Sequence, residues 1–204
     1  MMDKPTIHVV DDDPAFRKSV ARLLRLSGYE TAHYESGSEL LEQLKECGPG
    51  CILLDLDMPG LSGLQLQTNV AGLEAPLPIV FLTGRGNIQA SVKAMKAGAE
   101  DFLCKPISKQ ELLAAIERAV ERDAKARAAR AELTDRRARV DTLTPREKQV
   151  FGLVVTGKLN KQIAYEISTT ERTVKAHRQK VMHKLQARSV IDLVSFAERL
   201  TVHG

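Results

Sequence analysis

Short apolar segments alternate with longer, more polar segments over the first 120 residues. The apolar segments are rich in Val, Ile and Leu, which favours β-strands. They lie at 6–10, 29–34, 51–54, 79–83 and 102–104. The segments between them favour helices, near 14–27, 38–46, 64–71, 87–97 and 109–121. Five strand–helix repeats predict an α/β fold with a doubly wound, five-stranded parallel sheet. The runs IHVV, CILL and PIVFL are almost wholly apolar, as burial on both faces requires.

Three of the expected helix starts carry residues that cap helices. Ser36 precedes Glu39 by three residues, and Ser108 precedes Glu111 in the same way. Both pairs fit a capping box, in which each side chain bonds the backbone amide of the other residue. Asp13 stands directly before a proline, so we expect it to cap the first helix rather than to serve as a third pocket acid.

The segment 121–142 breaks the alternation, because it has no Gly or Pro and is rich in Ala, Arg and Glu. That composition favours a helix that continues the preceding one. Small apolar residues recur every seven positions, at Ala119, Ala126, Leu133 and Val140. This stripe is too narrow to predict a coiled coil. We assign 122–142 to a helical linker, either a solvated spacer or a segment that pairs with a second copy.

Residues 143–204 predict a small all-α domain. Thr144 can cap a helix that starts at Pro145, with Glu147 completing a capping box, and Gly157 suits the position after its end. Ser189 is placed to cap the last helix. Further helices are expected near 159–167, 171–186 and 189–200. A helix, a short turn and a second helix fit helix-turn-helix geometry.

Composition excludes several classes of protein. Hydrophobic residues make up 43% of the chain, which is typical of a globular protein, and no apolar run approaches the ~18–20 residues that span a bilayer. The N-terminus MMDKPTIHVVDDD lacks a signal-peptide core. Cys47, Cys51 and Cys104 form no metal-binding pattern and are expected to be small apolar residues in a reducing compartment. A cytoplasmic protein without membrane contact is therefore expected.

The net charge of +4 hides an asymmetry between the two ends of the chain. Residues 1–120 carry 12 Lys/Arg and 16 Asp/Glu, whereas residues 121–204 carry 18 Lys/Arg and 10 Asp/Glu. An acidic first part and a basic second part indicate two different tasks, with a polyanion as the partner of the basic part.

Acidic and other polar residues lie at the ends of the expected strands of the first part. The residues concerned are Asp11 and Asp12 after the first strand, Asp55 and Asp57 after the third, Thr83 at the end of the fourth and Lys105 after the fifth. The carboxyl ends of parallel strands meet at one edge of the sheet, where open α/β sheets bind ligands. Clustered carboxylates favour a hard divalent cation, most naturally Mg²⁺. A cation, a lysine and a threonine hydroxyl suit a phosphoryl group on a nucleophilic carboxylate.

These residues carry a resemblance to a known family. The motifs VVDDD, LLDLDMPGLSG, FLTGRG and MKAGAEDFLCKP resemble the receiver domain of two-component response regulators, which has a flavodoxin-like fold. The motifs LTPREKQV, GKLNKQIA and TERTVKAHRQKVMHKL resemble the LuxR-type DNA-binding domain. Together, in this order, they resemble the FixJ-like response regulators. The resemblance implies a receiver at 1–121 and a helix-turn-helix domain at 143–204.

The resemblance also implies roles for individual residues. Asp55 would accept a phosphoryl group from the phosphohistidine of a sensor histidine kinase. Asp12 would be the main Mg²⁺ ligand, together with Asp11, Asp55 and the backbone carbonyl of Asp57, whose side chain is either catalytic or solvated. Lys105 would contact the phosphoryl oxygens. Thr83 would move toward the phosphate, and Phe102 would follow as the switch aromatic or remain a core residue.

One helix near 171–186 separates an apolar face from a polar face. Val174, Val181 and Leu185 share the face expected to meet the core, and Lys175 and Gln179 lie four residues apart on another face. The polar face suits the major groove of DNA, although a solvated cationic face is the alternative for any single lysine.

The resemblance also implies which residues of this surface contact DNA. Lys175, Ala176 and Gln179 would meet base edges, and His177 is expected to pack or cap instead. Phosphate contacts would come from Lys161, Arg172, Thr173, Arg178 and Lys184. In the last helix, Ile191, Val194, Leu193 and Phe196 would serve either a dimer contact or the core.

The combined expectation is a transcription regulator rather than an enzyme. Phosphorylation would promote a receiver homodimer that reads double-stranded promoter DNA, with RNA polymerase as a further candidate partner. Three alternatives stay open: a phosphatase of the haloacid dehalogenase type using Asp55-x-Asp57, a LuxR-type regulator that senses a small molecule, and a regulator that binds DNA weakly even without phosphate.

Overall fold

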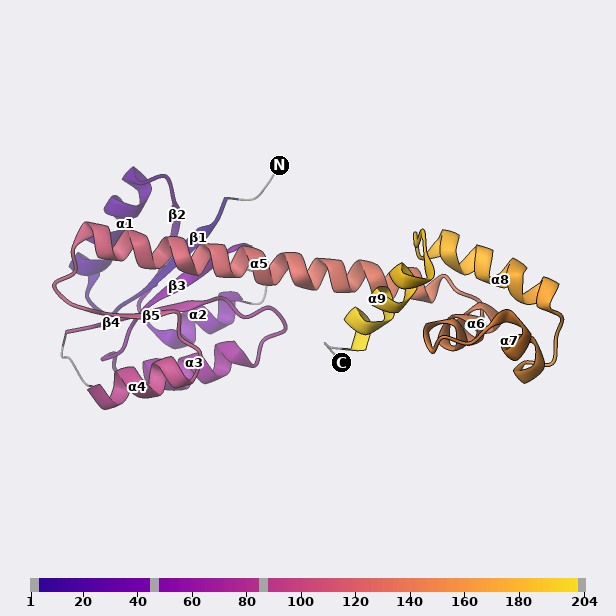
Figure 1. The fold of residues 1–204 in the computed structure, drawn as a ribbon. Helices are drawn as coiled ribbons and strands as arrows, with labels where there is room; N and C mark the ends of the chain where they lie inside the picture. Colours follow the sequence, from indigo (N-terminus) through magenta and orange to yellow (C-terminus); the bar gives the residue numbers. More distant parts are fainter. Residues whose placement is uncertain (1–3, 45–47, 85–87, 202–204) are drawn as a thin grey trace. The chain divides into compact units, whose positions relative to one another are not determined.

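The computed structural model describes residues 4–44, 48–84 and 88–201, and it divides into two compact units at 1–127 and 128–204 (Figure 1). Cys47 and the expected helix ends at 46 and 87 lie outside the described residues. Among the described helices, none is long and apolar enough to cross a membrane.

The N-terminal unit alternates strands and helices as expected. Its elements are β1 (Thr6–Val10), α1 (Pro14–Leu26), β2 (Glu30–Tyr34), α2 (Gly37–Gln43), β3 (Gly50–Asp55), α3 (Gly63–Ala71), β4 (Ile79–Thr83), α4 (Ile88–Lys96), β5 (Asp101–Cys104) and α5 (Lys109–Asp141). The described strands form one parallel sheet in the order β2-β1-β3-β4-β5. This confirms the doubly wound α/β fold.

Two apolar cores cover the two faces of this sheet. Successive residues of a strand point to opposite faces, so Ile7 and Val9 of β1 join the core shared with α1 and α5. Ile52 and Leu54 of β3 join the other core, which includes residues of α2, α3 and α4. Helices α1 and α5 lie on one side of the sheet and α2 to α4 on the other (Figure 1). The continuous apolar runs therefore contribute side chains to the cores on both faces of the sheet.

The helix caps are confirmed in most cases. The Asp13 side chain accepts a hydrogen bond from the amide of Ala15 at 2.8 Å, and α1 begins at Pro14. Ser108 and Glu111 form the expected reciprocal bonds. The box at Ser36 is only half formed, because its hydroxyl caps α2 while Glu39 accepts from the amide one residue earlier, that of Glu35.

Helix α5 continues without interruption through most of the expected linker. The linker's first residues belong to the N-terminal unit, because Asp123 is 1% exposed and accepts a hydrogen bond from the amide of Gly50 at 3.0 Å. Arg127 bonds Asp123 at 2.7 Å and the carbonyl of Gly48 at 2.6 Å. A Cβ on Gly50 would lie 1.9 Å from the carbonyl oxygen of Thr6, so this position requires glycine.

The C-terminal unit packs the end of α5 with α6 (Pro145–Val155), α7 (Asn160–Glu166), α8 (Glu171–Lys184) and α9 (Val190–Thr201). The capping box of Thr144 and Glu147 and the caps by Thr170 and Ser189 define helix starts. Helix α8 ends two residues earlier than expected, because Gln186 has a positive φ of 54°.

The structure also separates the apolar residues of α9. Leu193 and Phe196 are buried in the core of the C-terminal unit, and the Phe196 ring lies edge-on to Phe151. Ile191 is 79% exposed. Of the four residues that the sequence left between a core and a dimer contact, Leu193 and Phe196 therefore serve the core.

Candidate functional site

The acidic residues converge at the carboxyl edge of the sheet through strand register. Val10 of β1 lies beside Leu54 of β3, so Asp11 and Asp55 follow on neighbouring strands. On the other side of β3, the register places Thr83 beside Cys104 of β5, directly before Lys105. The sheet thus gathers residues that are up to 94 positions apart in sequence.

Lys105 lies between two of these carboxylates. Its Nζ is 2.6 Å from Asp11 Oδ2 and 3.0 Å from Asp55 Oδ2. The same ammonium lies 4.0 Å from the centroid of the Phe16 ring, in a cation–π contact. The lysine is therefore held directly beside the expected phosphoacceptor.

The carboxylates exceed the cations that neutralise them. Asp11 is fully buried, and its burial raises the pKa of its carboxyl even though Lys105 and the amide of Asp13 oppose that rise. Partial burial of Lys105 acts to lower the pKa of its ammonium, but the hydrogen bonds to Asp11 and Asp55 outweigh it and raise that pKa. One lysine is thus firmly charged, and it is shared by two of the acids.

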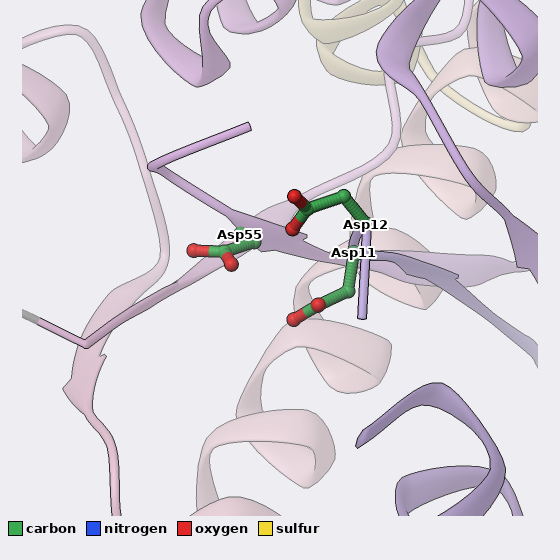
Figure 2. A group of neighbouring side chains, drawn as sticks. All are labelled: Asp11, Asp12 and Asp55. Carbon is green, nitrogen blue, oxygen red and sulfur yellow. The ribbon is translucent and has the colours of Figure 1, made fainter. Parts of the chain in front are cut away.

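Asp11, Asp12 and Asp55 each offer an oxygen within 4.8 Å of the others. The carboxylates of Asp11 and Asp12 point to the side of the sheet edge where Asp55 lies (Figure 2). Three carboxylate oxygens at this spacing suit a hard divalent cation such as Mg²⁺, which takes oxygen ligands. The donor set therefore fits the expected ion.

Asp57 and Thr83 face each other across the site. The amide of Asp57 donates to Asp55 Oδ1 at 3.2 Å, and its own carboxylate accepts from the Thr83 hydroxyl at 3.2 Å. The Asp57 side chain is thus exposed and at the same time bonded to Thr83, and its role stays a prediction. The use of its backbone carbonyl as a metal ligand stays a prediction.

A hollow of about 490 Å³ opens over these residues and is lined by Asp55, Asp57, Gly84 and Lys105. Phe102 is half-buried against the core, with its ring centroid 6.2 Å from that of Phe81. Its ring therefore lies between the core and the surface, on the strand that leads to Lys105.

The sequence analysis did not identify two residues of this site. Phe16 packs under the Lys105 ammonium, and Arg17 donates to the backbone carbonyl of Asp11 at 2.5 Å and to Glu35 at 2.8 Å. Both lie on the first turn of α1, directly after the acidic run. That position was the available signal, because a helix that starts at the sheet edge turns its first residues toward the site.

In the C-terminal unit, α8 separates its faces as expected. Val174, Val181 and Leu185 are at most 2% exposed, whereas Lys175 and Gln179 are exposed. His177 is half-buried, in line with a packing role.

The exposed face of α8 extends further than the sequence interpretation placed it. A hollow of about 380 Å³ is lined by Ala176, Gln179, Lys180, His183 and Lys184. Lys180 and His183 were missed, although each lies four residues after a residue already assigned to this face.

Two of the expected phosphate contacts have partners inside the domain. Lys184 Nζ lies 2.7 Å from Glu147 Oε2 and donates to the carbonyl of Thr142 at 2.9 Å. Arg178 donates to Asn160 of α7 at 2.6 Å. Both side chains stabilise the helix-turn-helix in this structure, and their phosphate contacts stay predictions.

Comparisons with known proteins find two domain families in the chain, in the order that the sequence motifs predicted. Residues 7–117 match the response regulator receiver domain, and residues 141–197 match the bacterial regulatory proteins of the luxR family. The chain therefore belongs to the two-component response regulators that join a receiver domain to a LuxR-type DNA-binding domain. It is a transcription factor of this class, whose partners are a histidine kinase and DNA.

Relatives along almost the whole chain carry the same pairing. Nodulation protein W of Bradyrhizobium diazoefficiens is 44% identical over 199 residues, covering 98% of this chain and 88% of that protein. Transcriptional regulatory protein FixJ of Rhizobium meliloti is 40% identical over 192 residues, covering 94% of each. The structure of response regulator StyR matches with a TM-score of 0.86 at 42% identity, covering 97% of this chain and 100% of that one.

Proposed function

We propose that Asp55 accepts a phosphoryl group from the phosphohistidine of a kinase, and that this event controls DNA binding. The observation that carries the proposal is the position of the Asp55 carboxylate in the wall of the 490 Å³ hollow, 3.0 Å from the Lys105 ammonium. The two other acids within 4.8 Å supply a site for a divalent cation.

The transfer is a substitution at phosphorus. A carboxylate oxygen of Asp55 forms the new P–O bond, the P–N bond to the histidine breaks, and its electron pair returns to the imidazole nitrogen. Lys105 stabilises the charge on the phosphoryl oxygens, because its position beside Asp55 is already set by the Asp11 contact. Asp11, Asp12 and Asp55, with the Asp57 carbonyl, would hold a Mg²⁺ ion, which neutralises phosphoryl charge when bound.

The change in charge then reaches the outer strands of the sheet. A phosphoryl group adds about −1.5 to −2 charges and new acceptor oxygens. Thr83 can exchange its bond to Asp57 for one to a phosphoryl oxygen, because its hydroxyl already lies at the site. Phe102 is the next half-buried ring on the neighbouring strand and would follow this shift inward. The altered face would favour a receiver homodimer.

Light scattering tests the switch directly. With Mg²⁺ and beryllofluoride, which mimics an aspartyl phosphate, we expect the molar mass to rise from monomer to dimer. Asp55→Ala should remain monomeric under the same conditions. A dimer that forms equally well in Asp55→Ala would refute the assignment of the switch.

For DNA recognition we propose that Lys175, Ala176 and Gln179 read base edges, and that Lys161, Arg172 and Thr173 position the domain on phosphates. Gln can bond adenine with two hydrogen bonds, and Lys can donate to guanine. All of these residues except the half-buried Thr173 are exposed on α8 or α7.

A comparison of two lysines tests this surface. Lys175→Gln should weaken binding to a selected operator and change its sequence preference, while the stability of the domain stays the same. Lys184→Gln should lower the stability of the domain, because this lysine pairs with Glu147. Equal loss of sequence preference in both variants would contradict the division.

A further inference from the structure

A second hollow lies in the N-terminal unit, apart from the acidic site. It is a groove of about 500 Å³ between α1 and β2. Four cations of α1 line it, at Arg17, Lys18, Arg22 and Arg25, and His33 lines it from β2. The four cations recur at helical spacing, so one face of α1 presents them together. Because β2 is at the edge of the sheet, no further strand lies beyond it among the described residues.

Most of the charge in this groove is uncompensated. No carboxylate lines it, and within the described part of the chain neither Lys18 nor Arg22 forms an ion pair. Arg25 bonds only neutral groups, the Thr31 hydroxyl at 3.0 Å and His33 Nε2 at 3.2 Å. Arg17 alone has an acid partner, Glu35. The groove therefore presents several cations to one small volume.

The titration of His33 is consistent with this positive potential. Partial burial, followed by the charges of Arg25 and Arg17, lowers the pKa of its imidazole. At neutral pH the ring is thus kept neutral, and it offers a planar surface and a hydrogen-bonding nitrogen beside the cations.

The rest of the lining is apolar. Ala21 is buried beneath the groove, Pro14 lies at its start and Leu26, 77% exposed, at its end. A volume of this size is typical of sites for small ligands, which combine apolar walls with a few charged groups. A simple solvated basic face would need neither the concave shape nor the apolar lining.

We propose that this groove binds a small organic anion, in which a carboxylate or phosphate group is attached to an apolar, ring-sized body. The anionic oxygens would bond Lys18, Arg22 and Arg25, and the apolar body would lie along Ala21 and Leu26. Arg17 also bonds the backbone carbonyl of Asp11 in the acidic site, but the groove uses none of the carboxylates there, so the proposed binding does not require phosphorylation.

Two-dimensional NMR of the full chain tests the proposal, with phenyl phosphate and benzoate as probes. The solution contains EDTA, because without a divalent cation the carboxylates at Asp55 repel anions. We expect saturable shifts in the amide signals of α1 and β2 with at least one of the two probes, and the better probe identifies the anionic group. Benzyl alcohol and inorganic phosphate, which each lack one half of the ligand, should bind about tenfold more weakly.

A matched pair of double variants completes the test. Lys18→Gln/Arg22→Gln should weaken binding about tenfold or more. Lys93→Gln/Lys96→Gln, which removes two exposed cations of α4, should leave it unchanged. The proposal is overturned if neither probe saturates, if inorganic phosphate binds as tightly as the probes, or if both double variants weaken binding equally. Binding of polyanions without either probe would overturn it as well.

Discussion

Each unit of this protein holds a lysine beside a buried carboxylate, and the two arrangements behave in opposite ways. In the N-terminal unit, Lys105 bonds Asp11, which is fully buried, and also Asp55. In the C-terminal unit, Lys184 bonds Glu147, which is 3% exposed. The pKa of Asp11 is raised by its burial, whereas the pKa of Glu147 is lowered to about 2, chiefly by its bond to Lys184.

The difference lies in the balance of charge. The Glu147 carboxylate has one lysine partner, Lys184, and also accepts a hydrogen bond from the amide of Thr144, so its negative charge is well satisfied. Asp11 shares its lysine with Asp55 and has Asp12 within reach as well. A balanced pair stabilises a fold, and an unbalanced cluster is poised for a ligand that brings positive charge or for a reaction.

The largest expected effect is the complete loss of phosphorylation when Asp55 of the unbalanced acidic cluster is replaced. Asp55→Asn should form no acyl phosphate with a small-molecule phosphodonor, because an amide is not a nucleophile for this reaction. Its free energy of unfolding should equal or exceed that of the parent, since one of several repelling charges is removed. Phosphate-sensitive gel shifts and calorimetry measure the two quantities. A variant that is destabilised instead would show that the cluster is already balanced.

The next largest effect is expected in the pH dependence of stability, which should differ between the two units. Burial lowers the pKa of His8 to about 4, from 6.5. Its unfolded form therefore binds a proton that the folded form rejects, and the stability of the N-terminal unit should fall as the pH drops from 6.5 toward 4. The expected loss is on the order of 3 kcal/mol. Denaturant unfolding across this pH range measures it, and His8→Gln should flatten the dependence.

The low pKa of Glu147 predicts that acid destabilises the C-terminal unit at a lower pH than the N-terminal unit. Its folded pKa lies below its unfolded value, so its stabilising contribution is present above pH 4.5 and is lost as the pH falls toward 2. At neutral pH, Glu147→Gln should cost about 2 kcal/mol, because hydrogen bonds to a charged group are lost. Hydrogen exchange of the amides in α6 checks both statements. Unchanged exchange in this variant would contradict the stabilising role.

The smallest effect is expected from the metal. Mg²⁺ at ten times its dissociation constant should stabilise the N-terminal unit by about 1.4 kcal/mol. The C-terminal unit should not respond, because none of its described residues belong to a group of acids that could hold a metal ion. Asp12→Asn should weaken the response and leave the fold unchanged, since Asp12 is exposed. Calorimetry with and without Mg²⁺ tests this, and equal stabilisation of both units would indicate nonspecific binding.

The strands and most helix caps could be predicted because they depend on local sequence. An apolar run such as CILL has to be buried on both faces, and Thr144 and Glu147 are close enough in the chain to complete a cap without help from the rest of the fold. The order of acids, threonine and lysine at the strand ends then followed from the parallel sheet alone.

Contacts between distant segments could not be predicted in this way. Asp123 belongs by composition to a charged linker, yet the fold buries it on the amide of Gly50. Lys184 belongs by charge to a DNA-facing helix, yet α6 places Glu147 beside it. A charged side chain near a surface has the same sequence pattern whether it meets solvent, a ligand or another helix.

The sequence by itself therefore determined the fold class, the order of the two domains and the residues that gather at the carboxyl edge of the sheet, because local periodicity and strand direction dictate them. Only the tertiary structure decided which charges are compensated. That balance depends on partners brought together from distant parts of the chain, and it separates the acidic cluster at Asp55 and the cationic groove of α1 from the satisfied pair at Glu147.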